Sequence, residues 1–201
     1  MTASTSGYHA GMVSETREAL LDAAARLLDA GGVEAVTLRE VGRQAGVSHN
    51  APYKHFPSKE YLLAALAARE LERRAARPEP SASPADRLRE ALHSYVRWAL
   101  DSPARFRLIF GPWTVDSTEL HLAADAAQSR FVDTVVTAQQ ADLLPPGDPV
   151  RLASLLRSLA HGAADLAAAG HLAAGGKGNA DPADLVDDLL AHLRPALGPK
   201  P

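Results

Sequence analysis

The sequence predicts an all-α protein, and its composition and its periodicity both support this. Alanine and leucine dominate the 201 residues, whereas aromatic residues make up only 5%, and this balance favours helices over strands. Apolar residues recur at the spacing of an amphipathic helix in four stretches, which begin at Leu20, Leu88, Leu152 and Leu185. The sequence has no sustained period-two alternation and no Asn-Gly or Asp-Gly pair, so nothing in it indicates a β-hairpin.

Composition and charge narrow the class of protein further. The chain has no cysteine, which excludes a disulfide-stabilised scaffold, a thiolate zinc site and a cysteine nucleophile, and fits a reducing cytoplasm. A net charge of only -3 means that the chain as a whole is not a polycation. No apolar run reaches the roughly 18 residues of a membrane span, and residues 1–11 lack the features of a signal peptide. We therefore expect a soluble, cytoplasmic protein without a membrane partner.

Segments rich in proline or glycine divide the predicted helices into groups. Residues 77–84 contain three prolines, residues 144–149 contain three more, and residues 175–178 contain three glycines. Because both residue types disfavour helix interiors, each segment predicts a break. We expect a flexible tail at 1–14, an N-terminal helical domain with a connecting helix at 15–76, and a C-terminal domain at 84–201.

The first part of the N-terminal domain shows the start and stop signals of two helices. A helix at 15–30 is followed by Gly31-Gly32, where a C-terminal cap belongs. Thr37 and Glu40 have the spacing of a capping box, which predicts a short helix that ends at Gly46.

The next two helices follow directly. Ser48 is a suitable N-cap for a helix at 49–56, in which Pro52 falls in the first turn. Ser58 caps a longer helix from Lys59 to about Ala76. Two short helices joined by a glycine-containing turn form a helix-turn-helix, whose second helix can enter the major groove of DNA.

The charge along this segment favours a phosphate backbone. Residues 41–59 include no acidic residue but contain Arg43, Lys54 and Lys59. Because a carboxylate would repel phosphate, an acid-free stretch is what approach to DNA requires. Lys59 also lies at a helix N-terminus, which attracts phosphate. The apolar residues of the segment are predicted to be core, namely Val41, Val47 and Phe56.

Three runs of residues in this region form a specific pattern. They are Thr37-Leu38-Arg39-Glu40-Val41-Gly42-Arg43-Gln44-Ala45-Gly46-Val47-Ser48, Ala51-Pro52-Tyr53-Lys54-His55-Phe56 and Ser58-Lys59-Glu60. With them the chain resembles the TetR/AcrR family of bacterial transcriptional regulators over residues 15–65. The resemblance implies a homodimeric DNA-binding regulator, most often a repressor that a small-molecule effector releases from a palindromic operator.

The resemblance also implies which side chains contact double-stranded DNA. It places backbone contacts at Tyr53, Lys54 and Lys59, and base contacts at His49, Asn50 and Ala51. The full set of predicted contacts adds four neighbours: Thr37, Arg39, Ser48 and His55. For His55, packing against the core is an equally good interpretation.

Behind this domain the resemblance implies a helical effector-binding and dimerisation domain, with helices at about 85–101, 103–110, 116–142, 149–169 and 182–193. Phe106-Arg107-Leu108-Ile109-Phe110-Gly111, His161-Gly162 and Gly170-His171-Leu172 resemble a subgroup named for a Trp-His-Gly motif. The tryptophan of that motif, four residues before His161, is replaced here by Arg157.

Aromatic residues of the C-terminal domain concentrate between positions 95 and 131. Since effector pockets are lined by apolar rings with a few polar groups, we expect the pocket there. Its predicted members are Tyr95, Trp98, Phe106, Phe110, Trp113, His121, Phe131, His161 and Asp165. The alternative is that these rings are plain core.

The last two helices carry small alanines and leucines, which suit close helix–helix contact in a dimer. The predicted interface consists of Leu152, Leu155, Leu156, Leu159, Ala163, Leu185, Leu189, Leu190 and Leu193. An intramolecular core is the alternative for these residues.

Other functions find little support in the sequence. The eight histidines are dispersed and have no zinc-protease spacing. There is no Gly-x-Ser-x-Gly elbow and no phosphate-binding loop, so we expect no catalytic residue, metal or cofactor. A transcriptional activator, a ligand-independent regulator and a protein-interaction module remain as alternatives.

Overall fold

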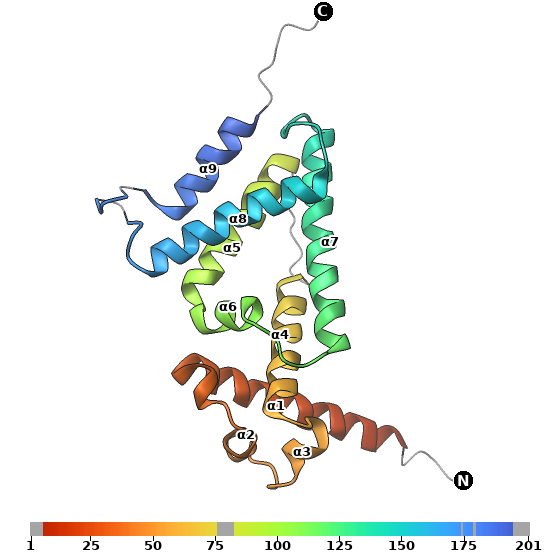
Figure 1. The fold of residues 1–201 in the computed structure, drawn as a ribbon. Helices are drawn as coiled ribbons and strands as arrows, with labels where there is room; N and C mark the ends of the chain where they lie inside the picture. The colour runs from red at the N-terminus through yellow and green to blue at the C-terminus, as the bar shows by residue number, and fades with distance from the viewer. Residues whose placement is uncertain (1–5, 76–82, 174, 179, 195–201) are drawn as a thin grey trace, which may run out of the picture. The chain divides into compact units, whose positions relative to one another are not determined.

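The computed structural model describes residues 6–75, 83–173, 175–178 and 180–194, and within them all regular structure is helical, as predicted (Figure 1). The helices are α1 (Ser6–Ala35), α2 (Leu38–Gln44), α3 (Ala51–His55), α4 (Lys59–Ala75), α5 (Pro84–Asp101), α6 (Pro103–Phe110), α7 (Thr118–Gln140), α8 (Pro149–Ala168) and α9 (Pro182–Leu193). None of them has the length and apolarity needed to cross a bilayer.

The chain folds as two compact units that are not contiguous in sequence. The first consists of Met1–Arg74 with Ala104–Ala124, and the second of Ala75–Pro103 with Asp125–Pro201. Helix α6 and the start of α7 thus belong with the helix-turn-helix, although the sequence-based boundary at 76–84 assigned them to the C-terminal domain. Most of that boundary, residues 76–82, lies outside the described residues.

The first unit is built around α1 and α4. Leu20, Leu21 and Leu28 of α1 and Leu62 and Leu66 of α4 are fully buried. Buried residues of the helix-turn-helix and of the second chain segment join this core: Leu38, Val41, Phe56, Leu108, Leu120 and Ala123. Residues 104–124, although distant in sequence, therefore supply part of the core of the N-terminal domain.

Helix α1 starts earlier than predicted, at Ser6 rather than at residue 15, so much of the expected tail is helical. Residues 1–5 lie outside the described residues. The predicted break at Gly31-Gly32 is confirmed, because both glycines leave the helical conformation and Gly32 has a φ of 68°. A further helical turn follows them to Ala35.

Three helices of the second unit begin with the same local device. Ser83, Asp148 and Asp181 are N-caps whose side chains accept a hydrogen bond from an amide of the first turn, and each is followed by proline. Helices α5, α8 and α9 pack on one another. Their shared core includes Leu88, Leu92 and Val96 of α5, Ala153, Leu156 and Ala160 of α8, and Val186 of α9.

Candidate nucleic-acid interface and effector region

The turn between α2 and α3 depends on one cap and two glycines. Thr37 is the N-cap of α2, and its Oγ1 accepts a hydrogen bond from the Glu40 amide at 3.2 Å, as the capping-box spacing predicted. Gly46 has a φ of 68°, in the left-handed region that favours glycine. A Cβ on Gly42 would lie 2.7 Å from Cγ of Pro52, so glycine is what lets α2 pack this closely on α3.

Helix α3 begins two residues later than predicted, and Ser48 is not its N-cap. Asn50 occupies the N-cap position, and its side chain makes no capping hydrogen bond. The Ser48 carbonyl accepts a hydrogen bond from the Ala51 amide at 3.0 Å, which closes a turn before the helix. Pro52 explains the shift. A helix starting at residue 49 would need the residue-52 amide as a donor, whereas a start at Ala51 puts the proline where no donor is needed.

Most of the predicted DNA contacts lie on an exposed surface of the first unit. Tyr53 is 51% exposed, and its ring lies 6.0 Å from that of His49. The exposed residues are Thr37, Arg39, Ser48, His49, Asn50, Tyr53 and Lys54, and the half-buried ones are Ala51, His55 and Lys59. The His55 ring lies 6.3 Å from that of Phe56, in line with a packing role. Val41 and Phe56 are buried and Val47 packs against them, so the predicted core residues are confirmed.

Two cations of the acid-free stretch, Arg43 and Lys54, differ in their surroundings. Arg43 donates from Nη2 to Glu40 Oε1 at 2.6 Å and from Nε to Oε2 at 2.9 Å. This pairing raises the pKa of Arg43 and lowers that of Glu40. Within the described residues Lys54 forms no ion pair, so its ammonium group is available to a phosphate. Arg43 is therefore a weaker candidate for a phosphate contact than its charge alone suggested.

Two arginines tie the second segment of the first unit to α1 and α4, and sequence reasoning missed both. Arg17 lies over the Phe56 ring, 5.4 Å from its centre, and its Nη2 donates to both carboxylate oxygens of Glu119 at 2.7 Å. Arg105 of α6 forms a bidentate pair with Asp29 of α1, at 2.6 and 2.9 Å, which raises its pKa.

Arg105 also reaches Glu70 of α4, whose side chain is only 7% exposed, at 3.1 Å. No sequence motif marks these pairs, because their partners are 35 to 102 residues apart. They couple α6 and the first turn of α7 directly to the helices that carry the helix-turn-helix.

The predicted effector residues fall into both units. Phe106, Phe110, Trp113 and His121 belong to the first unit, in which the Phe106 and Phe110 rings are 5.0 Å apart. Trp113 packs against the buried core there and donates from Nε1 to the Ile109 carbonyl at 3.4 Å. His121 is exposed, 3.4 Å from an Asp116 carboxylate oxygen.

The remaining predicted members lie in the second unit: Tyr95, Trp98, Phe131, His161 and Asp165. Tyr95 Oη and His161 Nδ1 are hydrogen-bonded at 2.9 Å, and the Trp98 ring meets Tyr95 edge-on at 6.2 Å. Arg157, the residue at the place of the motif tryptophan, lies over the Phe131 ring at 5.3 Å. Asp165 is exposed. Helices α5, α7 and α8 therefore bring an aromatic and polar cluster together.

The residues predicted to form the dimer interface differ in how much of their side chains is exposed. Leu156 is fully buried and Ala163 is 5% exposed, both inside the single chain, so these two cannot form an interface between chains. Helical periodicity turns them to the core, whereas Leu155 stays 53% exposed. The other predicted members are half-buried: Leu152, Leu159, Leu185, Leu189, Leu190 and Leu193. Leu166, which was not predicted, is 48% exposed.

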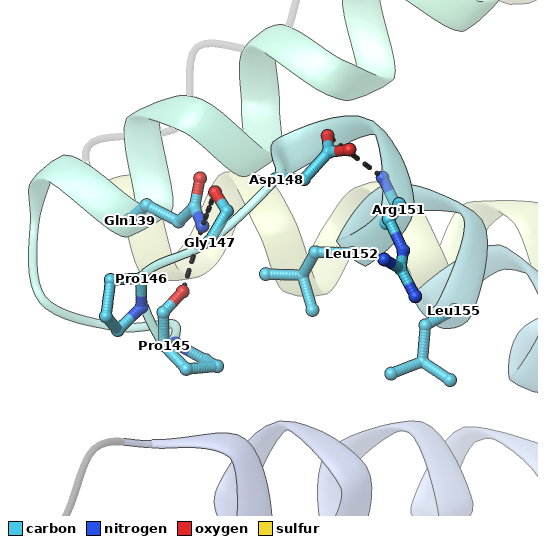
Figure 2. Close-up of a pocket in the computed structure, with 8 residues that line it drawn as sticks. All are labelled: Gln139, Pro145, Pro146, Gly147, Asp148, Arg151, Leu152 and Leu155. Carbon is cyan, nitrogen blue, oxygen red and sulfur yellow. Dashed lines mark hydrogen bonds between the residues drawn. The ribbon is translucent and has the colours of Figure 1, made fainter.

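A surface depression of about 500 Å³ lies between the α7–α8 loop and the first turns of α8 (Figure 2). Gln139 of α7 holds the loop by donating to the carbonyls of Pro145 at 2.9 Å and Gly147 at 3.3 Å. Leu152 and Leu155 line the other side of the depression. The described side chains contain no cluster of three acids or histidines that could hold a metal ion.

Two family models match the chain and together span most of it. The model for bacterial regulatory proteins of the tetR family matches residues 20–66, and the model for the Tetracyclin repressor-like C-terminal domain matches residues 88–193. A helix-turn-helix followed by such a domain defines a DNA-binding transcriptional regulator, not an enzyme. The chain belongs to the TetR family.

Curated relatives of this chain include two repressors of the same name. The chain is 34% identical over 123 residues to the HTH-type transcriptional repressor KstR of Rhodococcus jostii, a match that covers 60% of this chain and 54% of that one. Against KstR of Mycobacterium tuberculosis it is 32% identical over 125 residues, covering 60% and 53%. The chain thus matches about half the length of these relatives.

Solved structures share the fold over nearly the whole chain. A protein of unknown function from Rhodococcus sp. RHA1 is 31% identical with a TM-score of 0.75, over 90% of this chain and 96% of that one. A TetR-family transcriptional regulator from Agrobacterium tumefaciens has a TM-score of 0.64 at 20% identity, over 91% and 100%. The latter similarity concerns the fold alone.

Proposed function

We propose that this TetR-family regulator is a repressor that binds a palindromic operator as a homodimer and leaves it when a small molecule binds. The main support for DNA binding is that Tyr53 and Lys54 of α3, and Asn50 just before it, are all exposed. The close packing of α2 on α3 at Gly42 holds this surface in one geometry. The repressor role is supported by the KstR relatives, which are repressors by name.

The side chains of this surface suit two kinds of contact. Lys54 and Tyr53 offer an ammonium and a hydroxyl to phosphates, which position a protein on DNA without reading its sequence. His49 and Asn50, on the turn before α3, can hydrogen-bond base edges in the major groove. Two such surfaces in a two-fold dimer would meet half-sites about 34–36 Å apart, one turn of the duplex.

Dimerisation is supported by leucines left partly or largely exposed along α8 and α9. Leu155 and Leu166 are each about half exposed on one side of α8. Apolar side chains in a row on a helix surface gain stability when a second copy covers them. A dimer in which α8 and α9 pack against the same helices of a second copy has two-fold symmetry, as a palindromic DNA site does.

Release by an effector requires that the ligand prefer a conformation that does not fit the operator. The ion pairs of Arg17 with Glu119 and of Arg105 with Asp29 and Glu70 support such a mechanism. They attach α6 and the start of α7 to α1 and α4. A ligand-dependent change in α6 or α7 would therefore act on the helices that carry α2 and α3.

Selection of bound duplexes from a random library tests the DNA-binding proposal. We expect one enriched palindromic sequence, and a reporter gene placed behind it should be repressed when the protein is present. Asn50→Ala should relax the preference at one base pair per half-site, by about 1–3 kcal/mol for a lost bidentate contact. Selection without enrichment would contradict the proposal, and reporter activation would contradict the repressor role.

A further inference from the structure

The most unusual charged group in the second unit is the guanidinium of Arg157. It lies on α8, half-buried, with the Phe131 ring of α7 5.3 Å away. Among the described residues no carboxylate forms an ion pair with it, whereas Arg89 and Arg97 of the same unit each pair with an acid. A half-buried cation without a carboxylate partner is costly, since burial removes its hydration without supplying a counter-charge.

The electrostatics agree with this placement. Burial lowers the pKa of Arg157, and the phenol of Tyr95 opposes that shift in part. An arginine is charged under all conditions in which proteins fold, so the guanidinium keeps its charge there and retains its hydrogen-bond donors. The cation–π contact with Phe131 occupies one face of the planar group and leaves its N–H edge for an acceptor.

The groups near Arg157 include aromatic rings and side chains that form hydrogen bonds. Tyr95 on α5 and His161, one turn beyond Arg157 on α8, share a hydrogen bond of 2.9 Å. Trp98 lies edge-on against Tyr95 at 6.2 Å. Asp165, two turns further along α8 than Arg157, is exposed, and a rise of 1.5 Å per residue puts it about 12 Å away along the helix axis. The cluster therefore combines one cation with aromatic surface.

We propose that Arg157 binds the carboxylate of a small amphipathic organic acid whose apolar body contacts the rings of Tyr95, Trp98 and Phe131. A guanidinium can hold a carboxylate through two parallel N–H···O bonds, and the acid would supply the counter-charge that the chain lacks at this position. The inference rests on the proposed function, because it names the chemical class of the effector.

Titration of the full-length protein with acid and amide pairs tests the proposal. The probes are phenylacetate, octanoate and decanoate, each beside its uncharged amide, and binding is measured by calorimetry. We expect at least one acid to bind more tightly than its amide. Arg157→Gln should weaken that acid about ten- to hundredfold, as for a lost charge-assisted hydrogen bond, and should leave the amide almost unchanged. Arg151→Gln is the matched control, because it removes an exposed charge from the same helix.

A second measurement separates ligand binding from a structural role. Without any ligand, Arg157→Met should unfold at the same temperature as the wild type or higher, because it removes a half-buried unpaired charge. A lower unfolding temperature would show that the arginine stabilises the fold, and would overturn the proposal. Equal binding of acids and amides, retained acid affinity in Arg157→Gln, or binding of none of the acids would overturn it as well.

The two proposals fail separately. Operator binding by the wild type and by Arg157→Gln is measured without any probe, and both should bind equally. If both bind DNA while the acid titrations fail, the assignment of Arg157 is wrong and the regulator function stands. If the wild type selects no DNA, the proposed function fails whatever the titrations show.

Discussion

At the scale of single residues, the charge available to DNA depends on pairing more than on the number of basic residues. Arg43 and Lys54 both belong to the acid-free stretch, but Arg43 is held by Glu40 while Lys54 is exposed and forms no ion pair among the described residues. Each phosphate contact releases condensed counterions and so contributes to the salt dependence of binding. The two residues therefore form a natural matched pair for experiment.

Lys54→Ala should weaken binding to all DNA sequences and should reduce the slope of log affinity against log salt by about one. Arg43→Ala should change that slope much less, because its charge is already compensated by Glu40. Fluorescence anisotropy on the selected duplex, repeated at several salt concentrations, measures both slopes. Equal losses in the two variants would show that Arg43 leaves Glu40 to contact phosphate.

The packing of α2 on α3 makes a second prediction at this scale. Gly42→Ala would place a Cβ 2.7 Å from Pro52 Cγ, and the proline ring cannot yield easily. We expect a loss of about 1–3 kcal/mol of unfolding free energy, the usual cost of overpacking, together with weaker operator binding. Gln44→Ala, at an exposed position of the same helix, should stay within about 0.5 kcal/mol of the wild type in urea unfolding. A Gly42→Ala protein as stable as that control would contradict this account.

At the scale of elements, local signals predicted the helices of the second unit almost to the residue. Serine or aspartate followed by proline starts α5, α8 and α9, and such a cap is readable without the fold. The predicted start of α3 at residue 49 was wrong. A helix that begins there needs residue 52 as a hydrogen-bond donor, and Pro52 has no amide hydrogen. The sequence did not show that α6 packs in the first unit. That packing depends on contacts between distant residues, such as Arg105 with Asp29, which are 76 residues apart.

Arg105 allows a direct test of how α6 is held. Arg105→Ala would leave the buried Glu70 carboxylate without its closest cation, since Arg73 approaches it only to 4.0 Å. An unsatisfied buried acceptor costs about 1–3 kcal/mol, so we expect that loss in urea unfolding. Arg107→Ala removes an exposed arginine from the same helix and should be nearly neutral. Equal stability of the two variants would show that α6 does not depend on this ion pair.

At the scale of the whole molecule, the predicted DNA contacts all lie in one unit, whereas the predicted effector residues are divided between two. The DNA surface is local in sequence, and its motif specifies both its turn and its exposed residues. The aromatic residues at 95–131 are also close in sequence, but the chain passes from one unit to the other twice between Tyr95 and Phe131. Closeness along the chain therefore did not identify a single site. The position of Arg157 among rings was found only in the folded chain.

The dimer is the prediction on which operator binding depends, and the neighbours Leu155 and Leu156 separate its surface from the core. Leu155→Asp would place a charge on the 53% exposed leucine that a second copy is proposed to cover. We expect a folded monomer in sedimentation equilibrium, with helical circular dichroism retained and operator affinity reduced, because the two half-sites are no longer bound together.

Leu156→Asp would instead bury a charge among α5, α8 and α9, at a cost of several kcal/mol. We expect this variant to unfold, with loss of the helical circular dichroism signal, and not to form a folded monomer. Ser154→Asp adds the same charge at an exposed position of α8 and should remain a dimer. A Leu155→Asp protein that sediments as a dimer and binds the operator normally would place the interface on another surface. Loss of the dimer in Leu155→Asp but not in Ser154→Asp would establish that this side of α8 joins the two recognition surfaces.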